Sequence, residues 1–340
     1  MELIEYIGDN METASPTEAL DKLTEEEIAN GAIVADPKWG FRMMLEPKTG
    51  VTHPPIFTVD ACEELRERYE IQPHDVIITT YPKCGTTWMQ QIMKLLLHGS
   101  EIQGGPSMNA RWFEWVASIK KQTNPVFIPM SVDEMLNLPV PTEDEGGLRG
   151  WQTHAPLHAV PWKGGLSQAA KVGAKLVIIA RNPKDACVSK YHHAKRIPTL
   201  GFTGRWENFY PLYLADKIVY GSFWDWHRDW WNAKEEHPDT ILWLFYEDMK
   251  KDLKKEISRL ANFLSLERSE EEIEKITERC TFKTMKAEID AKTGRTGSQS
   301  HYRKGEAGGW VDTFSEEQSN AFDERTEEMY KECTLRFECM

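Results

Sequence analysis

The sequence lacks several features that would assign it to other classes of protein. None of its 340 residues lie in an uninterrupted apolar run that approaches the roughly 18 residues of a membrane-spanning helix. The segment 1–6 is acidic, without a positive flank or an apolar core, so no secretory signal peptide is expected there. Lys and Arg number 41 against 54 Asp and Glu, and the formal net charge of -13 argues against nucleic acid or a membrane surface as a partner.

Paired cysteines are missing as well. The six cysteines are scattered without a CxxC spacing, which favours free thiols in a reducing compartment, and we expect a cytoplasmic protein. No dense group of carboxylates, or of Cys and His, marks a metal site, so no metal is expected. The GxxxxGK[ST] pattern of P-loop kinases and NTPases does not occur either.

What the sequence does contain is a set of short apolar runs with the character of buried strands, at Val76–Thr80, Lys175–Ala180 and Ile241–Tyr246. Segments of helical character lie between them, including Asp216–Glu236. Apolar strands separated by helices predict an α/β fold, a single domain with a central parallel β-sheet flanked by helices.

The rest of the chain divides simply. Residues 1–35 are acidic and weakly periodic, and we expect them to form a mobile N-terminal arm. Residues 36–340 are expected to form one domain. The composition of two segments, 141–150 and 287–309, predicts loops.

One strand runs directly into a turn that suits an anion. After Thr80 the chain reads Tyr-Pro-Lys-Cys-Gly-Thr-Thr-Trp and continues with helical spacing. A helix N-terminus offers unpaired N–H groups and a positive dipole end, and Lys83 beside it would make an anion site. Gly85 would let the backbone come close to the anion. A plain strand–helix turn with a Thr cap explains the same residues equally well.

Three further segments carry candidate chemistry. Arg181 follows the run 175–180, at the edge where open α/β sheets bind ligands. The segment 302–305 combines two cations with a glycine, which suits a phosphate. His154, which precedes Ala-Pro, is of the residue type that takes a proton near neutral pH. Each also has a plainer interpretation, as a surface arginine, a solvated basic loop or a histidine without a chemical role.

Together these segments resemble the motifs of the cytosolic sulfotransferase family. The family's TYPKSGTTW loop is similar to residues 80–88, and its ARNxKDxxVSxYH signature is similar to residues 180–192. LFYEDMK is present at 244–250, and the RKGxxGDW loop occurs at 303–310 with Gly309 in place of Asp. The resemblance extends from about Pro37 to the C-terminus, and its specificity comes from the order and spacing of the motifs.

The resemblance implies transfer of a sulfuryl group from 3′-phosphoadenosine-5′-phosphosulfate (PAPS) to a hydroxyl or amine of a small-molecule acceptor. The bisphosphate PAP is then the product, and the strand–loop–helix at 80–88 is a P-loop-like phosphosulfate site. It further implies that Lys83 stabilises the leaving group and that His154 is the base. The donor-binding residues that it implies are Lys83, Cys84, Gly85, Thr86, Thr87, Trp88, Arg181, Ser189, Tyr246, Cys280, Thr281, Phe282, Met285, Tyr302, Arg303, Lys304 and Gly305.

The resemblance also implies a wall for the acceptor. Its residues would be Trp112, Phe113, Trp115, Gln152, Tyr191 and His193, although the aromatic ones around 112–115 could equally be core. The family often has an aromatic residue where this chain has His193, which predicts an acceptor with polar groups rather than a simple apolar phenol. The connection from Val116 to Gly150 looks longer than in typical relatives, and we expect it to contribute to a reshaped lid.

The chain departs from the family pattern at several places. Gln152 stands where a Lys is usual and supplies no charge, and Cys84 replaces a Ser. The segment 311–320 does not match the family's dimer motif, KxxxTVxxxE, so a monomer or weak dimer is expected. Because of Gln152, an alternative interpretation stays open: the chain could be a nucleotide-binding relative of the family that has lost catalysis. A P-loop nucleotide kinase is less favoured, because Lys83 precedes Gly85.

Overall fold

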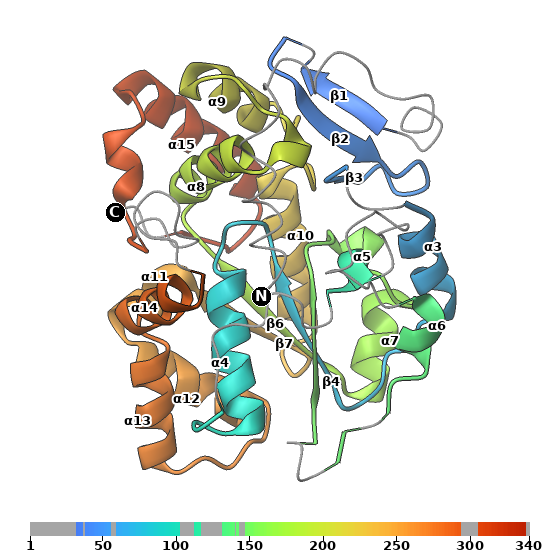
Figure 1. The fold of residues 1–340 in the computed structure, drawn as a ribbon. Helices are drawn as coiled ribbons and strands as arrows, with labels where there is room; N and C mark the ends of the chain where they lie inside the picture. Colours follow the sequence, from blue (N-terminus) through green and yellow to red (C-terminus); the bar gives the residue numbers. More distant parts are fainter. Residues whose placement is uncertain are drawn as a thin grey trace.

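Four parallel strands form the central sheet of the protein. The structure, a computed structural model, describes residues 32–36, 38–55, 59–102, 112–116, 131–139, 141–142, 147–293 and 305–337. The strand order is β5 (Arg149–Thr153), β4 (Asp75–Thr80), β6 (Lys175–Ala180) and β7 (Ile241–Phe245), and every neighbouring pair is parallel (Figure 1). Strands β4 and β6 lie in the middle and are buried almost throughout, which explains why their sequences are continuous apolar runs. The predicted α/β fold with a central parallel sheet is confirmed.

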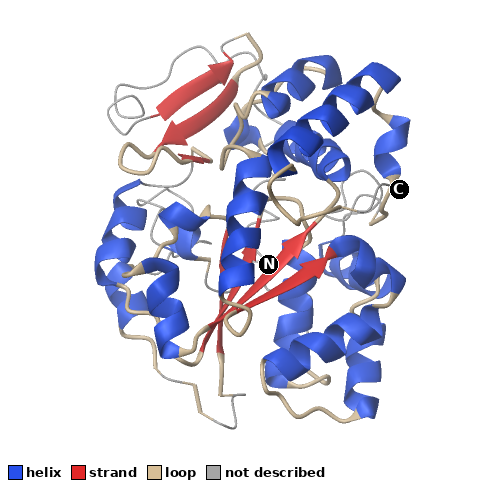
Figure 2. Cartoon of the chain, turned by 180° about the vertical axis from the view of Figure 1, so that it is seen from behind, coloured by secondary structure: helices blue, strands red, loops and turns tan. Residues whose placement is uncertain are grey.

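The two faces of the sheet belong to two separate apolar cores. Ile77 and Ile178 pack into one core together with side chains of α10 (Phe223–Glu236). Their strand neighbours Val76 and Ile179 pack into the other core, with α4 (Thr86–His98). Successive residues of a strand point to opposite faces, so each strand contributes to both cores. The two views show α4 and α10 on opposite faces of the sheet (Figures 1 and 2).

The remaining helices surround these two cores. They are α3 (Val59–Arg68), α5 (Phe113–Val116), α6 (Val132–Leu136), α7 (Gly165–Val172), α8 (Pro183–Arg196), α9 (Trp206–Leu214), α11 (Tyr246–Lys251), α12 (Leu253–Phe263), α13 (Glu270–Arg279), α14 (Phe282–Thr293) and α15 (Glu316–Tyr330). Short 3-10 helices lie at Leu157–Ala159, Pro198–Leu200 and Gly309–Asp312. No helix within the described ranges has the length and apolar character needed to cross a membrane.

A second, antiparallel sheet lies at the end of the molecule toward which the parallel strands point (Figure 2). Its strands are β1 (Ala32–Asp36), β2 (Phe41–Leu45) and β3 (Thr52–His53). Strand β1 pairs with β2, so residues 32–35, predicted as part of the N-terminal arm, belong to this sheet. Residues 1–31 lie outside the described residues, and their prediction as a mobile arm stays a prediction.

Strand β5 is the element of the central sheet that the sequence did not indicate. Its residues Arg-Gly-Trp-Gln-Thr include few of the β-branched residues that mark a strand. Tertiary contacts hold it in place: Arg149 pairs with Asp75 across the sheet, and its Nε donates to Asp75 Oδ1 at 2.7 Å. The loop prediction for 141–150 was therefore wrong at 149–150.

Three other predicted boundaries were wrong. Helix α14 continues to Thr293, so the predicted loop at 287–309 begins later than expected. The helix predicted from Asp216 begins only at Phe223, where Ser222 caps it by accepting a hydrogen bond from the backbone N–H of Asp225. Tyr246 is the first residue of α11 rather than the last residue of a strand.

Candidate active site

Four predicted site residues follow the carboxyl ends of the four parallel strands. Lys83 lies three residues after β4, whereas His154, Arg181 and Tyr246 come directly after β5, β6 and β7. Because the strands are parallel and paired in register, their carboxyl ends meet at one edge of the sheet. This edge is where open α/β sheets bind ligands, so the fold brings together residues that are far apart in the sequence.

The turn between β4 and α4 leaves the start of the helix open. Lys83 and Gly85 both have positive φ, 75° and 119°, and a Cβ on Gly85 would lie 3.2 Å from the Tyr246 ring. No side chain in the described part of the chain caps α4, whereas Asn182 caps the start of α8. The first N–H groups of α4 thus keep the capacity to bind an anion.

Cys84 lies below this turn rather than at its surface. The side chain is fully buried, and burial raises the pKa of the thiol to about 12. Its backbone N–H donates to the carbonyl oxygen of Tyr81 at 3.2 Å. The thiol is therefore unsuited to act as a nucleophile. Binding of the donor by the Cys84 amide stays a prediction.

Aromatic rings line the adjoining predicted adenosine site. Trp88 donates from Nε1 to the carbonyl oxygen of Cys280 at 2.7 Å, and its ring lies edge-on to Tyr246 at 5.2 Å between centroids. Phe282 lies so close to Gly305 that a Cβ on this glycine would be 2.0 Å from the ring. The structure thus brings Trp88, Tyr246, Cys280 and Phe282 together.

Other predicted donor-site residues make mostly local contacts. Thr86 Oγ1 lies 2.6 Å from Thr80 Oγ1, and Thr281 Oγ1 lies 2.9 Å from Thr284 Oγ1. Thr87 is half-buried in the first turn of α4, and Met285 is buried in α14. Ser189 is half-buried on α8. Tyr302, Arg303 and Lys304 lie outside the described residues, and their roles stay predictions.

Arg181 joins the segments of this edge. Its Nη1 donates to the carbonyl oxygen of Lys83 at 3.3 Å and its Nη2 to that of Glu306 at 2.9 Å. The guanidinium lies 4.5 Å from the centre of the Tyr246 ring. Nε is buried, and no described residue accepts a hydrogen bond from it. A buried donor without a partner is costly, so this atom marks a place for an anionic ligand.

Asp185 on α8 forms hydrogen bonds with the segment after Gly305. Its two carboxylate oxygens accept hydrogen bonds from the backbone N–H groups of Gly308 at 2.7 Å and Trp310 at 3.0 Å. The nearby Lys184 reaches across to Asp323 of α15 at 2.7 Å. The segment from Gly305 onward is therefore held beside Arg181 by ion pairs and backbone hydrogen bonds.

The hydrogen bonds of His154 determine which of its nitrogens carries the proton. Nδ1 lies 2.6 Å from the carbonyl oxygen of Thr80. A carbonyl oxygen only accepts, so Nδ1 is the protonated nitrogen and Nε2 carries the free lone pair. Among the described residues, none makes a hydrogen bond to Nε2. The ring is therefore oriented with Nε2 able to take a proton from a ligand.

The surroundings of His154 keep the imidazole neutral. Burial lowers its pKa to about 3, and the charges of Lys190 and Lys83 act in the same direction. The His154 backbone N–H donates to Oε1 of the buried Glu114 at 2.7 Å, and Trp226 donates to the His154 carbonyl oxygen at 3.1 Å. The segment is thus rigid, and His154 is in its basic form at neutral pH.

The predicted acceptor residues divide into different groups. Trp112 lies edge-on to His154 at 4.9 Å between ring centroids, and its role as a wall residue stays a prediction. Phe113 is fully buried and stacks on Trp151 at 4.7 Å, so it is core, the alternative that the sequence left open. Gln152 is buried too, and its Oε1 accepts a hydrogen bond from Gln90.

The structure describes the surroundings of the other predicted acceptor residues only in part. Tyr191 is half-buried on α8, where its ring lies 5.7 Å from Trp206. His193 is half-buried in the last turn of the same helix. Trp115 lies in α5, and its side chain is outside the described residues, as is much of the predicted lid at 116–150. A role of these residues in acceptor binding stays a prediction.

Sequence reasoning missed four residues that surround His154: Thr80, Glu114, Lys190 and Tyr220. Thr80 and Lys190 lie inside the motifs that carried the resemblance, but no local pattern distinguishes them. A carboxylate between aromatic residues, as at Glu114, was an available signal, because burial of a charge demands a partner. Tyr220 has a φ of 69°, which only the structure reveals.

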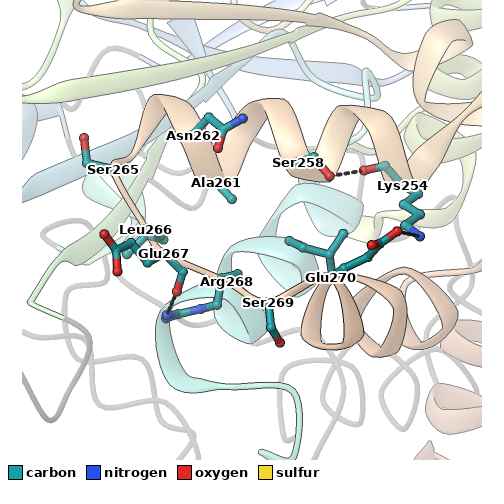
Figure 3. Close-up of a pocket in the computed structure, with 11 residues that line it drawn as sticks. Lys254, Ser258, Ala261, Asn262, Ser265, Leu266, Glu267, Arg268, Ser269 and Glu270 are labelled. Atoms are coloured by element: carbon teal, nitrogen blue, oxygen red, sulfur yellow. Dashed lines mark hydrogen bonds and ion pairs between the residues drawn. The ribbon is translucent and has the colours of Figure 1, made fainter.

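A hollow of about 840 Å³ lies elsewhere, between α12 and α13 (Figure 3). Lys254, Asn262, Arg268 and Glu270 are among its lining residues, and none of the predicted site residues is. Its polar groups bond to neighbouring protein groups: Ser258 Oγ donates to the Lys254 carbonyl oxygen at 2.9 Å, and Arg268 Nη2 donates to the Leu96 carbonyl oxygen of α4 at 2.6 Å. We therefore place the active site at the sheet edge. No group of three or more potential metal ligands occurs among the residues that the structure describes.

Comparison with known proteins identifies the family. The model of the sulfotransferase domain matches residues 73–334, more than half of the chain. Sulfotransferase 1A1 of Bos taurus is 33% identical over 283 residues, covering 80% of this chain and 88% of the relative. Sulfotransferase 1A1 of Mus musculus is 32% identical over 309 residues, covering 88% and 98%. The chain belongs to the cytosolic sulfotransferase family and is a sulfotransferase.

Solved structures share the fold. Mouse sulfotransferase SULT7A1 complexed with PAP has a TM-score of 0.63 at 23% identity, covering 84% of this chain and 94% of that one. Retinol dehydratase in a complex with retinol and PAP has a TM-score of 0.69 at 22% identity, covering 93% and 98%. At these identities the likeness concerns the fold, and it supports the α/β architecture described above.

Proposed function

We propose that this sulfotransferase moves a sulfuryl group from PAPS to a hydroxyl or amine of a small-molecule acceptor. The observation that carries the proposal is the hydrogen bond from His154 Nδ1 to the Thr80 carbonyl oxygen, because it leaves the Nε2 lone pair available as a base. The base follows β5 at the same sheet edge as Lys83 and Arg181. Family membership and the PAP complexes of two fold neighbours support PAPS as the donor.

The residues at the sheet edge fit such a donor. The uncapped start of α4 suits its phosphosulfate end, and the buried Nε of Arg181 suits its 3′-phosphate. The indole of Trp88 and the ring of Tyr246 suit stacking with adenine. When bound, the donor would supply the sulfuryl group and a phosphate leaving group.

In the proposed reaction, Nε2 of His154 takes the proton from the acceptor hydroxyl, whose oxygen forms the new bond to sulfur. Lys83 neutralises the charge left on the oxygen that bridged sulfur and phosphate, as that bond breaks. In-line placement and charge neutralisation contribute most to such transfers, so no covalent intermediate with the protein is required. The negative charge of the donor would raise the pKa of His154, which favours its role as base.

Binding and turnover measurements test this function. Titration calorimetry should show that PAP binds far more tightly than ATP, and radiolabelled PAPS with a panel of phenols, alcohols and amines should give labelled product. Tight ATP binding with weak PAP binding would instead support the kinase alternative. PAP binding without turnover of any acceptor would support the alternative that the chain is a nucleotide-binding relative that has lost catalysis.

We further propose a cytoplasmic protein that is a monomer or weak dimer. The described cysteines, Cys62, Cys84, Cys187, Cys280 and Cys333, are buried free thiols, as expected in a reducing compartment. Phe314, in the segment that replaces the dimer motif, packs within its own chain against Trp206 at 5.0 Å. Light scattering at micromolar concentration should give the mass of one chain. A stable dimer that Val311→Asp disrupts would contradict this, since Val311 is 58% exposed.

A further inference from the structure

Lys190 is a buried lysine to which the proposed function assigns no role. It lies on α8, its residue is 1% exposed, and its Nζ lies 5.5 Å from the centre of the Tyr81 ring and 5.7 Å from that of Tyr220. Its Nζ donates a long hydrogen bond, 3.4 Å, to the carbonyl oxygen of Val219. In the part of the chain that the structure describes, no carboxylate forms an ion pair with it.

An ammonium group in this position is costly without an anion. Burial, and next the charge of Lys83, lower the pKa of Lys190 well below its usual value. The titratable groups that face it are neutral or positive: Tyr81, Lys83 and Cys84 after β4, His154 after β5, and Tyr220 before α10. An anionic ligand would compensate the charge of the ammonium form, and no described residue pairs a carboxylate with it.

Lys190 lies on the side of the base rather than deep in the donor site. The ring of Tyr220 lies 5.2 Å from that of His154, and Lys190 stands over the same ring. The charge of Lys190 also acts on His154 more strongly than that of Lys83 does. The acceptor must reach Nε2 of His154, so Lys190 belongs to the wall that the acceptor meets.

Tyr220 provides a second unused polar group at this wall. Its Oη is buried, and no described residue lies within hydrogen-bond distance of it. Its backbone has a positive φ of 69°, a conformation that side chains other than glycine rarely adopt and that is concentrated at functional sites. A buried hydroxyl without a partner favours a ligand that supplies one.

We propose that Lys190 and Tyr220 bind an anionic oxygen group, such as a carboxylate, on the acceptor close to its reacting hydroxyl. The chemical class is then the phenolic acid, of which the hydroxybenzoates are the simplest members. This inference rests on the proposed function and specifies its substrate class. A bound anion would raise the lowered pKa of Lys190, so binding favours the ammonium form that pairs with it and draws protons from solvent.

Matched acceptors test the proposal. Each of the three hydroxybenzoates is compared with its methyl ester, which has the same ring and hydroxyl but no charge. At least one acid should have a higher kcat/KM than its ester with the wild-type enzyme. Lys190→Met should lower that acid-to-ester ratio roughly 10²-fold, because a buried charge loses its partner. Lys195→Met, on the exposed end of the same helix, serves as the control and should leave the ratio unchanged.

Binding to the PAP complex gives a readout besides turnover. Calorimetry in two buffers with different ionisation enthalpies should show that the wild type takes up a proton on binding the preferred acid, and that Lys190→Met does not. Tyr220→Phe should lower the acid-to-ester ratio several-fold, which keeps the proposal testable if Lys190→Met is unstable. A preference for every ester, or an unchanged ratio in both variants, overturns it. If PAP and all acceptors fail to bind, the proposed function is wrong, and this inference, which rests on it, is wrong as well.

Discussion

The two halves of the proposed active site are built in different ways. The donor half comprises the turn 81–88, Arg181, Tyr246 and the segment from Gly305, and it relies on main-chain N–H groups, strand ends and a helix start. The acceptor half comprises Trp112, His154, Lys190 and Tyr220, and it consists of single side chains from separate segments. Backbone geometry tolerates few changes, whereas a wall of single side chains can change one residue at a time. Acceptor preference should therefore change more readily on substitution than donor binding does.

The halves differ in their titratable groups as well. Arg181 joins the donor half through backbone carbonyl oxygens, and Lys83 stands half-buried beside it. The acceptor half instead holds titratable groups whose burial lowers their pKa, His154 and Lys190. Chemistry and pH sensitivity should therefore concentrate in the acceptor half, and nucleotide affinity in the donor half.

Removing the base should produce the largest difference between the effect on turnover and the effect on donor binding. His154→Ala is expected to lower kcat on the order of 10²–10⁴-fold, because the variant lacks the imidazole whose Nε2 is proposed to take the proton. PAP affinity should stay within about twofold, since donor contacts remain, and calorimetry measures it. His158→Ala, four residues further on and exposed, is the matched control. Wild-type turnover of the His154 variant under chemistry-limited conditions would exclude this residue from the mechanism.

A change in the donor half should show the opposite pattern. Arg181→Ala should weaken PAP roughly 10- to 100-fold more than adenosine 5′-phosphosulfate, which lacks the 3′-phosphate, because a charged hydrogen bond is lost. Some loss for both nucleotides is expected, since Arg181 also holds the Lys83 and Glu306 carbonyl oxygens. Arg181→Lys keeps the charge, so its PAP affinity, measured by calorimetry, should lie between those of the wild type and Arg181→Ala. Equal weakening of both nucleotides would contradict the assignment.

The stability of the fold should depend on pH through buried imidazoles such as that of His227, beside the turn 81–88. Burial lowers the pKa of His227 to about 3, and its ring lies 5.8 Å from that of Tyr81. Below its usual pKa of 6.5 the unfolded chain binds a proton that the folded chain does not, so stability falls as the pH drops from 6.5 toward 3.

His227→Phe should remove about 1.4 kcal/mol of this dependence per pH unit between about pH 6 and 4. Urea unfolding at several pH values measures it, and the exposed His158→Phe serves as the control. The same slope in wild type and His227→Phe would show that this imidazole is not kept neutral by the fold.

The smallest effect is expected at the rim of the acceptor half. His193→Phe should shift kcat/KM severalfold toward small phenols, because it replaces a polar group on α8 by an apolar ring. Competition between a simple phenol and a phenol with a second polar group measures the shift. A wild type that already prefers the simple phenol, with a ranking unaffected by the change, would exclude His193 as a specificity residue.

The features that could be predicted from the sequence are those that depend on residues close together in the chain. The central strands β4 and β6 were recognisable because both faces are buried, which requires continuous apolar residues. The turn 81–88 and Arg181 were recognisable because each directly follows such a strand. Strand β5 and the antiparallel sheet were not, because pairing partners rather than local composition determine them.

The sequence by itself thus determined the class of fold, and it predicts the donor half and the base, since each of these depends on a short motif beside a strand end. Only the tertiary structure decided which nitrogen of His154 is free, that Phe113 is core, and that Tyr220 lies beside His154 with Lys190 over its ring. The physical reason is that burial and hydrogen-bond partners come from segments distant in the chain. Thr80, for example, lies 74 positions from His154, the ring that its carbonyl oxygen orients.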